Sequence, residues 1–333
     1  MELCLDRSVE RQLCGALHNI GFSQLAFGAA ESLLAASSSR SPDNEDIFFE
    51  AAWRAQAWER TSVRGCPASH GVQAGYHNSL FQALKALASV EHAGRKQSPR
   101  NYADILDRVQ QHIQKARSVA LAAFQSECDS QSTKGSQAQL VRLQMCEDVK
   151  GFAKDLLGVE AATALPSPAQ SRGAFGSSRG NPSNSRKAAV EAICNIWHRR
   201  YDKLDSEFAL CEPLISLHAI LLRLSPHPEL LEKHLCLAAK VSMKQGNMSF
   251  ARGSMQKLQM WAASQSAAHG QGHPRAWWIR DAKMLVSVLL PACHCRRAKR
   301  ADIACRGRGR HATLCSVYPA WAQGVFHSVW RCH

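Results

Sequence analysis

Residues 50–60 read EAAWRAQAWER, in which two tryptophans lie five positions apart in an alanine-rich run with charged flanks. On an α-helix, five residues at about 100° each would put Trp53 and Trp58 roughly 140° apart. Both indoles can be buried in that geometry only if neighbours cover two faces of the helix. A stack of helices supplies two such neighbours, so we expect Trp53 to face one and Trp58 the other.

Helical periodicity dominates the chain from about residue 7 to 157, and the alternation typical of β-strands is almost absent. The run 101–124 repeats apolar residues at steps of three and four, with Asn101 as its expected N-cap. Clusters rich in Gly, Pro, Ser and charged residues interrupt the pattern at 21–24, 37–46, 64–75 and 94–99. The first half of the chain is therefore expected to be a series of helices.

Composition divides the chain into four segments. We expect helical repeats over 1–157 and 187–290, a flexible linker over 158–186, and a basic Cys- and Arg-rich tail over 291–333. The linker is rich in Ser, Gly, Pro and Asn and cannot bury enough apolar surface to order itself.

The second helical segment contains the clearest supersecondary pattern. Pro213 is expected as the first residue of a helix with a leucine stripe. Over 231–261, two apolar stripes flank a turn at Gly246 and Asn247, which predicts an αα-hairpin. The pattern predicts an all-α fold: a tetratricopeptide-like α-solenoid of antiparallel hairpins with a disordered insertion and tail, although the strict 34-residue consensus is not present. The residues expected to carry the packing are Trp53, Trp58, Leu217, Leu221, Leu258 and Trp261.

Composition also indicates the cellular environment in which the protein is expected to fold. No apolar run approaches the roughly 20 residues of a membrane span, so no membrane partner is expected. The N-terminal residues lack the apolar core of a secretory signal. Thirteen cysteines spread over 333 residues do not form the dense framework of a secreted domain. We expect an intracellular, reducing environment in which most thiols are buried and reduced.

The segment from Ala292 to His333 has a different composition from the rest of the chain. It carries eight Lys or Arg against one acid, a net +7 of the chain's total +14. Its ligand-type residues do not follow the paired Cys-x₂₋₄-Cys spacing of structural zinc sites, so no metal is assigned; they are Cys293, Cys295, Cys305, Cys315, His294 and His311. Its basic clusters are open to two interpretations, a nucleic-acid-binding tail or translated non-coding sequence, and the abrupt shift favours the second.

The remaining candidates favour structural roles over chemistry. His218 and His234 lie on apolar helical stripes and are expected to be hydrogen-bonded core histidines. Cys211 and Cys236 are expected to be small buried hydrophobes. A cluster of methionines is expected to pack in the core rather than form a docking or soft-metal surface: Met243, Met248, Met255 and Met260. We assign no catalytic, cofactor-binding or metal residue and no cofactor.

Four separated blocks resemble one known family in a single order. They are FFEAAWRAQAWE (48–59), GYHNSLFQALKAL (75–87), WHRRYDKLDSEFALCEPLISLHAILLRL (197–224) and KHLCLAAKVSMKQGNMSFARGSMQKLQMW (233–261). They are similar to the FAT domain of ATM-like (ataxia-telangiectasia mutated) kinases, which are phosphatidylinositol-3-kinase-related Ser/Thr kinases. The resemblance spans roughly residues 46–285.

The resemblance implies a regulatory helical scaffold that wraps a kinase domain in DNA double-strand break signalling. It also implies a nuclear location, a possible homodimer, and partners that include the kinase domain and further helical repeats of the same protein. After AWWIRDAKML the family would continue into helices and the kinase, whereas this chain continues into the basic tail. It has no phosphate-cradling or metal-holding kinase motif, so we expect it not to be an enzyme by itself. The alternative from the residues alone is a helical adaptor whose basic tail binds nucleic acid.

Overall fold

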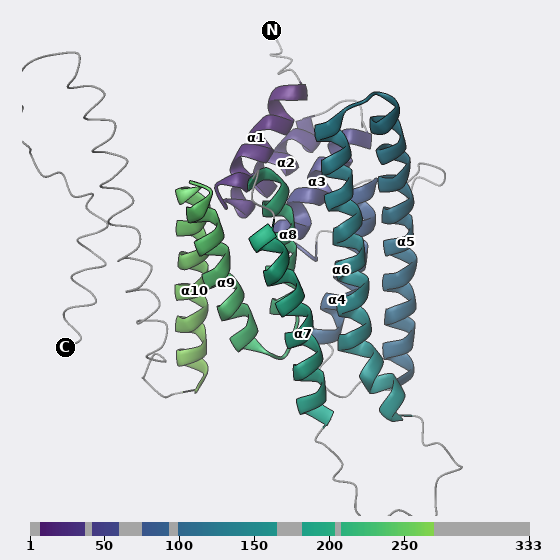
Figure 1. Ribbon diagram of the computed structural model, residues 1–333, viewed down its shortest axis with the longest axis vertical. Helices are drawn as coiled ribbons and strands as arrows, with labels where there is room; N and C mark the ends of the chain where they lie inside the picture. Colours follow the sequence, from purple (N-terminus) through teal and green to yellow (C-terminus); the bar gives the residue numbers. More distant parts are fainter. Residues whose placement is uncertain are drawn as a thin grey trace, which may run out of the picture. The chain divides into compact units, whose positions relative to one another are not determined.

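The computed structural model describes residues 7–36, 42–59, 75–92, 99–164, 182–203 and 208–269 (Figure 1). Within these ranges all regular secondary structure is α-helical. The helices are α1 Arg7–Asn19, α2 Ser23–Ala36, α3 Pro42–Ala55, α4 Tyr76–His92, α5 Pro99–Asp129, α6 Thr133–Ala164, α7 Pro182–Lys203, α8 Phe208–Arg223, α9 Pro228–Lys244 and α10 Met248–His269. The all-α, solenoid-like prediction is confirmed.

Most helices pack against the helix before and the helix after them in the chain. The longest hairpin pairs α5 with α6, which have 31 and 32 residues and lie side by side in Figure 1. Further contacts join α6 to α8, α7 to α9, and α3 to α8. The last of these connects helices from the two ends of the described region.

The predicted αα-hairpin is formed by α9 and α10. Gly246 has φ +81°, a left-handed conformation that glycine adopts without steric cost. Its N–H donates to the carbonyl of Met243, and the N–H of Asn247 donates to the carbonyl of Ser242. These two bonds are those of a Schellman motif, which ends one helix and reverses the chain into the next.

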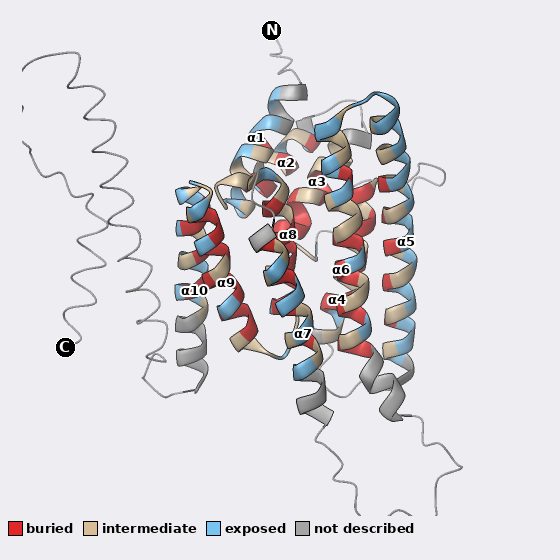
Figure 2. Cartoon of the chain, in the orientation of Figure 1, coloured by how far each residue is buried: buried red, intermediate tan, exposed pale blue. Residues whose placement is uncertain are grey.

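The core follows the inward faces of the helices, while α5 presents a long exposed face (Figure 2). Four of the six residues expected to carry the packing are fully or almost fully buried: Trp53, Leu217, Leu221 and Leu258. Trp58 and Trp261 keep part of their surface exposed.

Trp58 differs from its expected position because the helix ends before it. Helix α3 stops at Ala55, and Gln56 has φ +58°, which turns the chain back in a second Schellman motif. The Trp58 ring then lies 5.7 Å from the ring of Phe81 on α4, the same ring that Phe49 contacts at 5.4 Å. The two tryptophans therefore do not need two neighbouring helices, and the expectation of a helix running through both was wrong.

Two expected helix starts were also wrong. Helix α5 begins at Pro99, so Asn101 lies inside it and is not its N-cap. Helix α8 begins at Phe208, which places Pro213 within the helix rather than at its start. Pro213 is the sixth residue of α8, so it removes one intrahelical hydrogen bond, the one that an N–H at this position would donate to the carbonyl of Ala209.

Both ends of the predicted linker are helical. Helix α6 extends to Ala164 and α7 starts at Pro182, so the linker predicted over 158–186 is too long at each end. Apolar and alanine residues continue the helix beyond Gly158, and a proline suits the first turn of α7. Residues 165–181 lie outside the described ranges, as do the turn signal at 64–74 and the tail at 291–333 with its Cys and His residues. None of the described helices has the length and apolar character of a membrane span.

Candidate functional site

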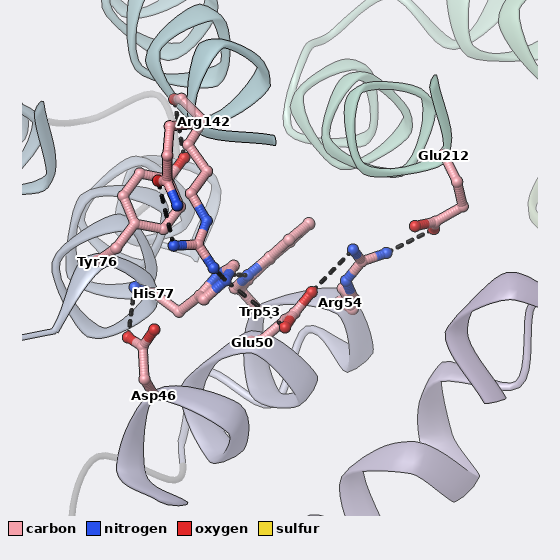
Figure 3. A network of polar contacts seen from close by, with 9 residues as sticks. Asp46, Glu50, Trp53, Arg54, Tyr76, His77, Arg142 and Glu212 are labelled. Atoms are coloured by element: carbon pink, nitrogen blue, oxygen red, sulfur yellow. Dashed lines mark hydrogen bonds and ion pairs between the residues drawn. The ribbon is translucent and has the colours of Figure 1, made fainter. Parts of the chain in front are cut away.

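Buried and half-buried polar side chains connect four helices of the described region (Figure 3). Helix α3 contributes Asp46, Glu50, Trp53 and Arg54, and the other helices contribute Tyr76, His77, Arg142 and Glu212. We call these eight residues the polar seam. Sites in proteins are often built from such clusters, so its geometry decides what chemistry it can perform.

The shortest contact in the polar seam is an ion pair between α3 and α8, whose two residues lie 158 positions apart in the sequence. Arg54 Nη1 lies 2.5 Å from Glu212 Oε1, and both side chains are only 3% exposed. Arg54 Nη2 lies 3.0 Å from Glu50 Oε1 one turn earlier on α3. Burial alone would lower the pKa of Arg54, but the two carboxylates raise it, so the guanidinium stays charged.

His77 is held in one neutral tautomer by its neighbours. The indole nitrogen of Trp53 can only donate, and it lies 3.3 Å from Nδ1 of His77, which must therefore accept. The proton of the neutral ring then resides on Nε2, which faces Glu50 Oε2 at 3.5 Å and lies equally far from Arg142 Nη2. The backbone N–H of His77 also donates to Asp46 Oδ1 at 2.7 Å. Burial lowers the pKa of His77, in agreement with a neutral ring.

Glu50 and Arg142 complete the polar seam. Burial opposes ionisation of Glu50, but His77 and Arg54 more than offset this and hold the pKa of Glu50 below its usual range. The Tyr76 hydroxyl donates to the Arg142 carbonyl at 2.9 Å, and the Arg142 guanidinium lies 5.0 Å from the Tyr76 ring centroid. The polar seam thus fixes how α3, α4, α6 and α8 sit against one another.

A second buried cluster joins α6, α7 and α8. Asp148 Oδ2 lies 2.9 Å from His218 Nε2, and Nδ1 of His218 makes a short hydrogen bond with the Tyr201 hydroxyl. Asp148 Oδ1 accepts from Arg200 Nη1 at 2.7 Å, and the His218 ring stacks on Trp197 with centroids 3.8 Å apart. His218 is therefore the hydrogen-bonded core histidine that the sequence predicts.

This second cluster has the connectivity of an acid, a base and a hydroxyl, but it cannot act as a nucleophilic site. Tyr201 is 3% exposed, and burial raises its pKa well above the usual value, so the phenolate does not form. Burial likewise lowers the pKa of His218. A substrate would need to reach the hydroxyl, and side chains of three helices enclose it. The cluster is a cross-link between helices.

The other predicted core residues lie as follows. His234 is fully buried, and its Nε2 donates to the carbonyl of Ile215 at 3.0 Å. Cys211 and Cys236 are buried, as predicted. Burial raises the pKa of Cys211 and raises that of Cys146 and Cys194 to about 12, so these thiols are not activated nucleophiles. Among the described residues, no group of three His, Cys, Asp or Glu could hold a metal ion.

The methionine prediction was wrong. None of Met243, Met248, Met255 and Met260 is buried, and Met260 is 69% exposed. Met248 and Met260 are exposed, whereas Met243 and Met255 are half-buried beside inner stripes filled by Leu, Ala and Phe side chains. A hollow of about 550 Å³ between α5 and α6 is lined mainly by Gln, Lys and Arg and crossed by an Arg117–Glu147 ion pair of 2.9 Å.

Sequence reasoning missed the polar seam and the Asp148 cluster. The available signal was a charged residue at an inward position of an apolar helix, as for Glu212 in FALCEPLISL and Asp148 in MCEDVKGF. Charged residues are seldom fully buried unless they are paired, so each predicts a partner. The partner itself could not be found from one sequence, because Arg54 lies 158 residues away from Glu212.

The fold and these clusters together define a class: an all-α protein of stacked hairpins whose described polar clusters join helices to one another. The chain matches the family model of the FAT domain over residues 45–288, which covers α3 to α10, and it belongs to that family. FAT domains are non-catalytic regions of phosphatidylinositol-3-kinase-related kinases, where they contact the kinase domain and other helical regions. No curated protein and no solved structure matches the chain.

Proposed function

We propose that this chain is a regulatory helical scaffold of an ATM-like protein kinase that acts in DNA double-strand break signalling in the nucleus. The observation that carries the proposal is the FAT match over 45–288, which covers eight of the helices found in the described ranges. The chain itself carries out no phosphoryl transfer in this account. Its partners are a kinase domain and further helical repeats, with a homodimer as the possible assembly.

The buried clusters supply the mechanical basis for such a role. Stacked helices share a continuous core, so a displacement of one hairpin is passed to its neighbours. The polar seam also fixes the positions of its four helices along one another, since a buried charge that loses its partner costs several kcal/mol. A partner that shifts α3 would therefore also shift α8, through the Arg54–Glu212 pair.

The test is a kinase assay on the native protein. An antibody against the exposed α5 face would be used to isolate the protein from cells of its source before and after induced double-strand breaks. We expect the isolated material to phosphorylate a peptide containing Ser-Gln, with higher activity after damage, and to leave a Ser-Ala peptide unmodified. Material that has no Ser-Gln activity under either condition would contradict the proposal.

The second candidate is a helical adaptor that binds nucleic acid through the tail, where half of the net charge lies. This candidate predicts DNA affinity that falls steeply with salt and is lost when 292–333 are deleted. The scaffold proposal predicts that the deletion leaves kinase association unchanged.

A further inference from the structure

The two ends of the described region meet at a junction of α1 and α3 with α8 and α10. Arg54 of α3 pairs with Glu212 of α8, and Asn247 at the start of α10 donates to the carbonyl of Asn19 at the end of α1, at 2.9 Å. In a linear solenoid each repeat touches only its neighbours. Here the chain returns on itself, and the two hydrogen-bonded contacts across the junction are polar, beside the apolar ring of Phe250 near Gly21.

Because these hydrogen-bonded contacts are polar, breaking them to open the junction costs less free energy than separating apolar faces would. Separating two apolar faces costs free energy in proportion to the area exposed. Separating a buried ion pair returns both charges to water, and their hydration offsets much of the lost attraction. The hairpin of α5 with α6 lacks this balance, since its inner face presents Ile105, Val109 and Ile113.

Two buried groups on the α1 and α3 side also remain unsatisfied in the closed arrangement. Arg54 Nε and His18 Nδ1 have no hydrogen-bond partner within the described part of the chain, and His18 is 4% exposed. Burial lowers the pKa of His18 to about 3, and the titratable groups around it are Arg54, Glu50, His77 and Lys257. Water would satisfy both orphaned atoms if the junction opened.

We propose that the Arg54–Glu212 pair is a latch, and that helices α1 to α3 separate from α8 and α10 and unfold together while the α5–α6 hairpin stays folded. The inference goes beyond the scaffold function and does not depend on which kinase the chain serves. It assigns a cooperative unfolding unit to the protein, made of the described residues 7–36 and 42–55, with the latch at its junction with α8 and α10.

Hydrogen exchange followed by mass spectrometry on the full chain tests the latch. Glu212→Gln removes the charge and keeps the shape, so exchange over 7–55 should rise at least tenfold while exchange over 99–129 stays unchanged. The double variant Arg54→Met with Glu212→Leu replaces the pair by apolar groups and should protect 7–55 at least as well as the wild type. Glu191→Gln, which breaks an exposed pair with Lys233, is the matched control and should change neither region.

Equal acceleration in both regions, no acceleration in either, or opening in the apolar double variant would overturn the latch. If Glu212→Gln does not fold, the latch is tested instead by hydrogen exchange of the wild type at increasing, sub-denaturing urea concentrations. The latch predicts that protection over 7–55 is lost as one unit at lower urea than protection over 99–129. Simultaneous loss in the two regions would refute it.

Discussion

Trp53 is the side chain on which the contacts of α3 converge. It is fully buried, its indole N–H donates to His77, and the Arg54 guanidinium lies 4.8 Å from its ring. The residue thus contributes apolar packing, a hydrogen bond that fixes a histidine tautomer, and a face for a buried cation. At the scale of residues, this side chain joins the core to the polar seam.

Trp53→Ala should lower the free energy of unfolding by about 3 to 5 kcal/mol, because it creates a large cavity beneath Arg54. Trp53→Phe keeps most of the apolar volume and loses the N–H, so a smaller loss of about 1 to 3 kcal/mol is expected. Urea unfolding followed by circular dichroism measures both. A loss below about 1 kcal/mol for Trp53→Ala would show that the indole is not packed as described.

The buried histidines predict acid sensitivity. Burial lowers the pKa of His18 and of His234 from 6.5 to about 3. The unfolded chain therefore binds more protons between these values, so stability is full above pH 6.5 and falls as the pH drops toward 3. Each histidine should cost about 2 kcal/mol between pH 7.5 and 5.0.

The measurement is urea unfolding at pH 7.5 and 5.0 for the wild type and for His18→Gln and His234→Gln. Each variant should reduce the difference between the two pH values by about 2 kcal/mol, whatever its stability at pH 7.5. His112 on α5 is half-buried, and burial lowers its pKa less far, so His112→Gln should reduce the difference by a smaller amount. The same pH difference in all four proteins would refute the assignment.

At the scale of elements, the helix ends are the most regular feature. Four helices end in a Schellman motif, with Gly21, Gln56, Gln131 or Gly246 in the left-handed conformation. Glycine takes that conformation freely, whereas a side chain costs roughly 1 to 2 kcal/mol there. Two of the four positions therefore carry backbone strain at glutamine.

Gln131→Gly should stabilise the protein by about 0.5 to 1 kcal/mol, since relief of the strain exceeds the entropy that glycine adds to the unfolded chain. Gln131 is exposed between α5 and α6, so no packing is lost. Gly246→Ala should have the opposite sign and destabilise by about 1 kcal/mol. Thermal unfolding compares the two variants, and stabilisation by Gly246→Ala would contradict the assigned turn.

These turns also explain how much of the elements could be predicted. The α9–α10 hairpin was predictable because a glycine marks its turn and apolar stripes flank it. The end of α3 was not, because glutamine at 56 gives no turn signal and the helical pattern continues through Trp58. The start of α8 was missed for a similar reason: Pro213 normally marks a first turn, and here the helix precedes it by five residues.

At the scale of the whole molecule, the fold class and the family follow from periodicity and from the order of the resembling blocks. The contacts of α8 and α10 with α1 and α3 cannot be predicted in that way. It depends on a charge pair separated by 158 residues, and one sequence contains no signal of which distant Arg meets Glu212. The candidate site was therefore predictable only as buried charges needing partners.

The central claim is that this helical array serves a kinase of its family. The most direct test is to isolate the native protein with an antibody against the exposed α5 face and to identify, by mass spectrometry, every polypeptide present after chemical cross-linking. We expect a phosphatidylinositol-3-kinase-related kinase domain, in the same polypeptide or as a stoichiometric partner, with cross-links to lysines of the described helices. Recovery of the chain without any such kinase domain, under conditions that preserve cross-links within α5 and α6, would contradict it.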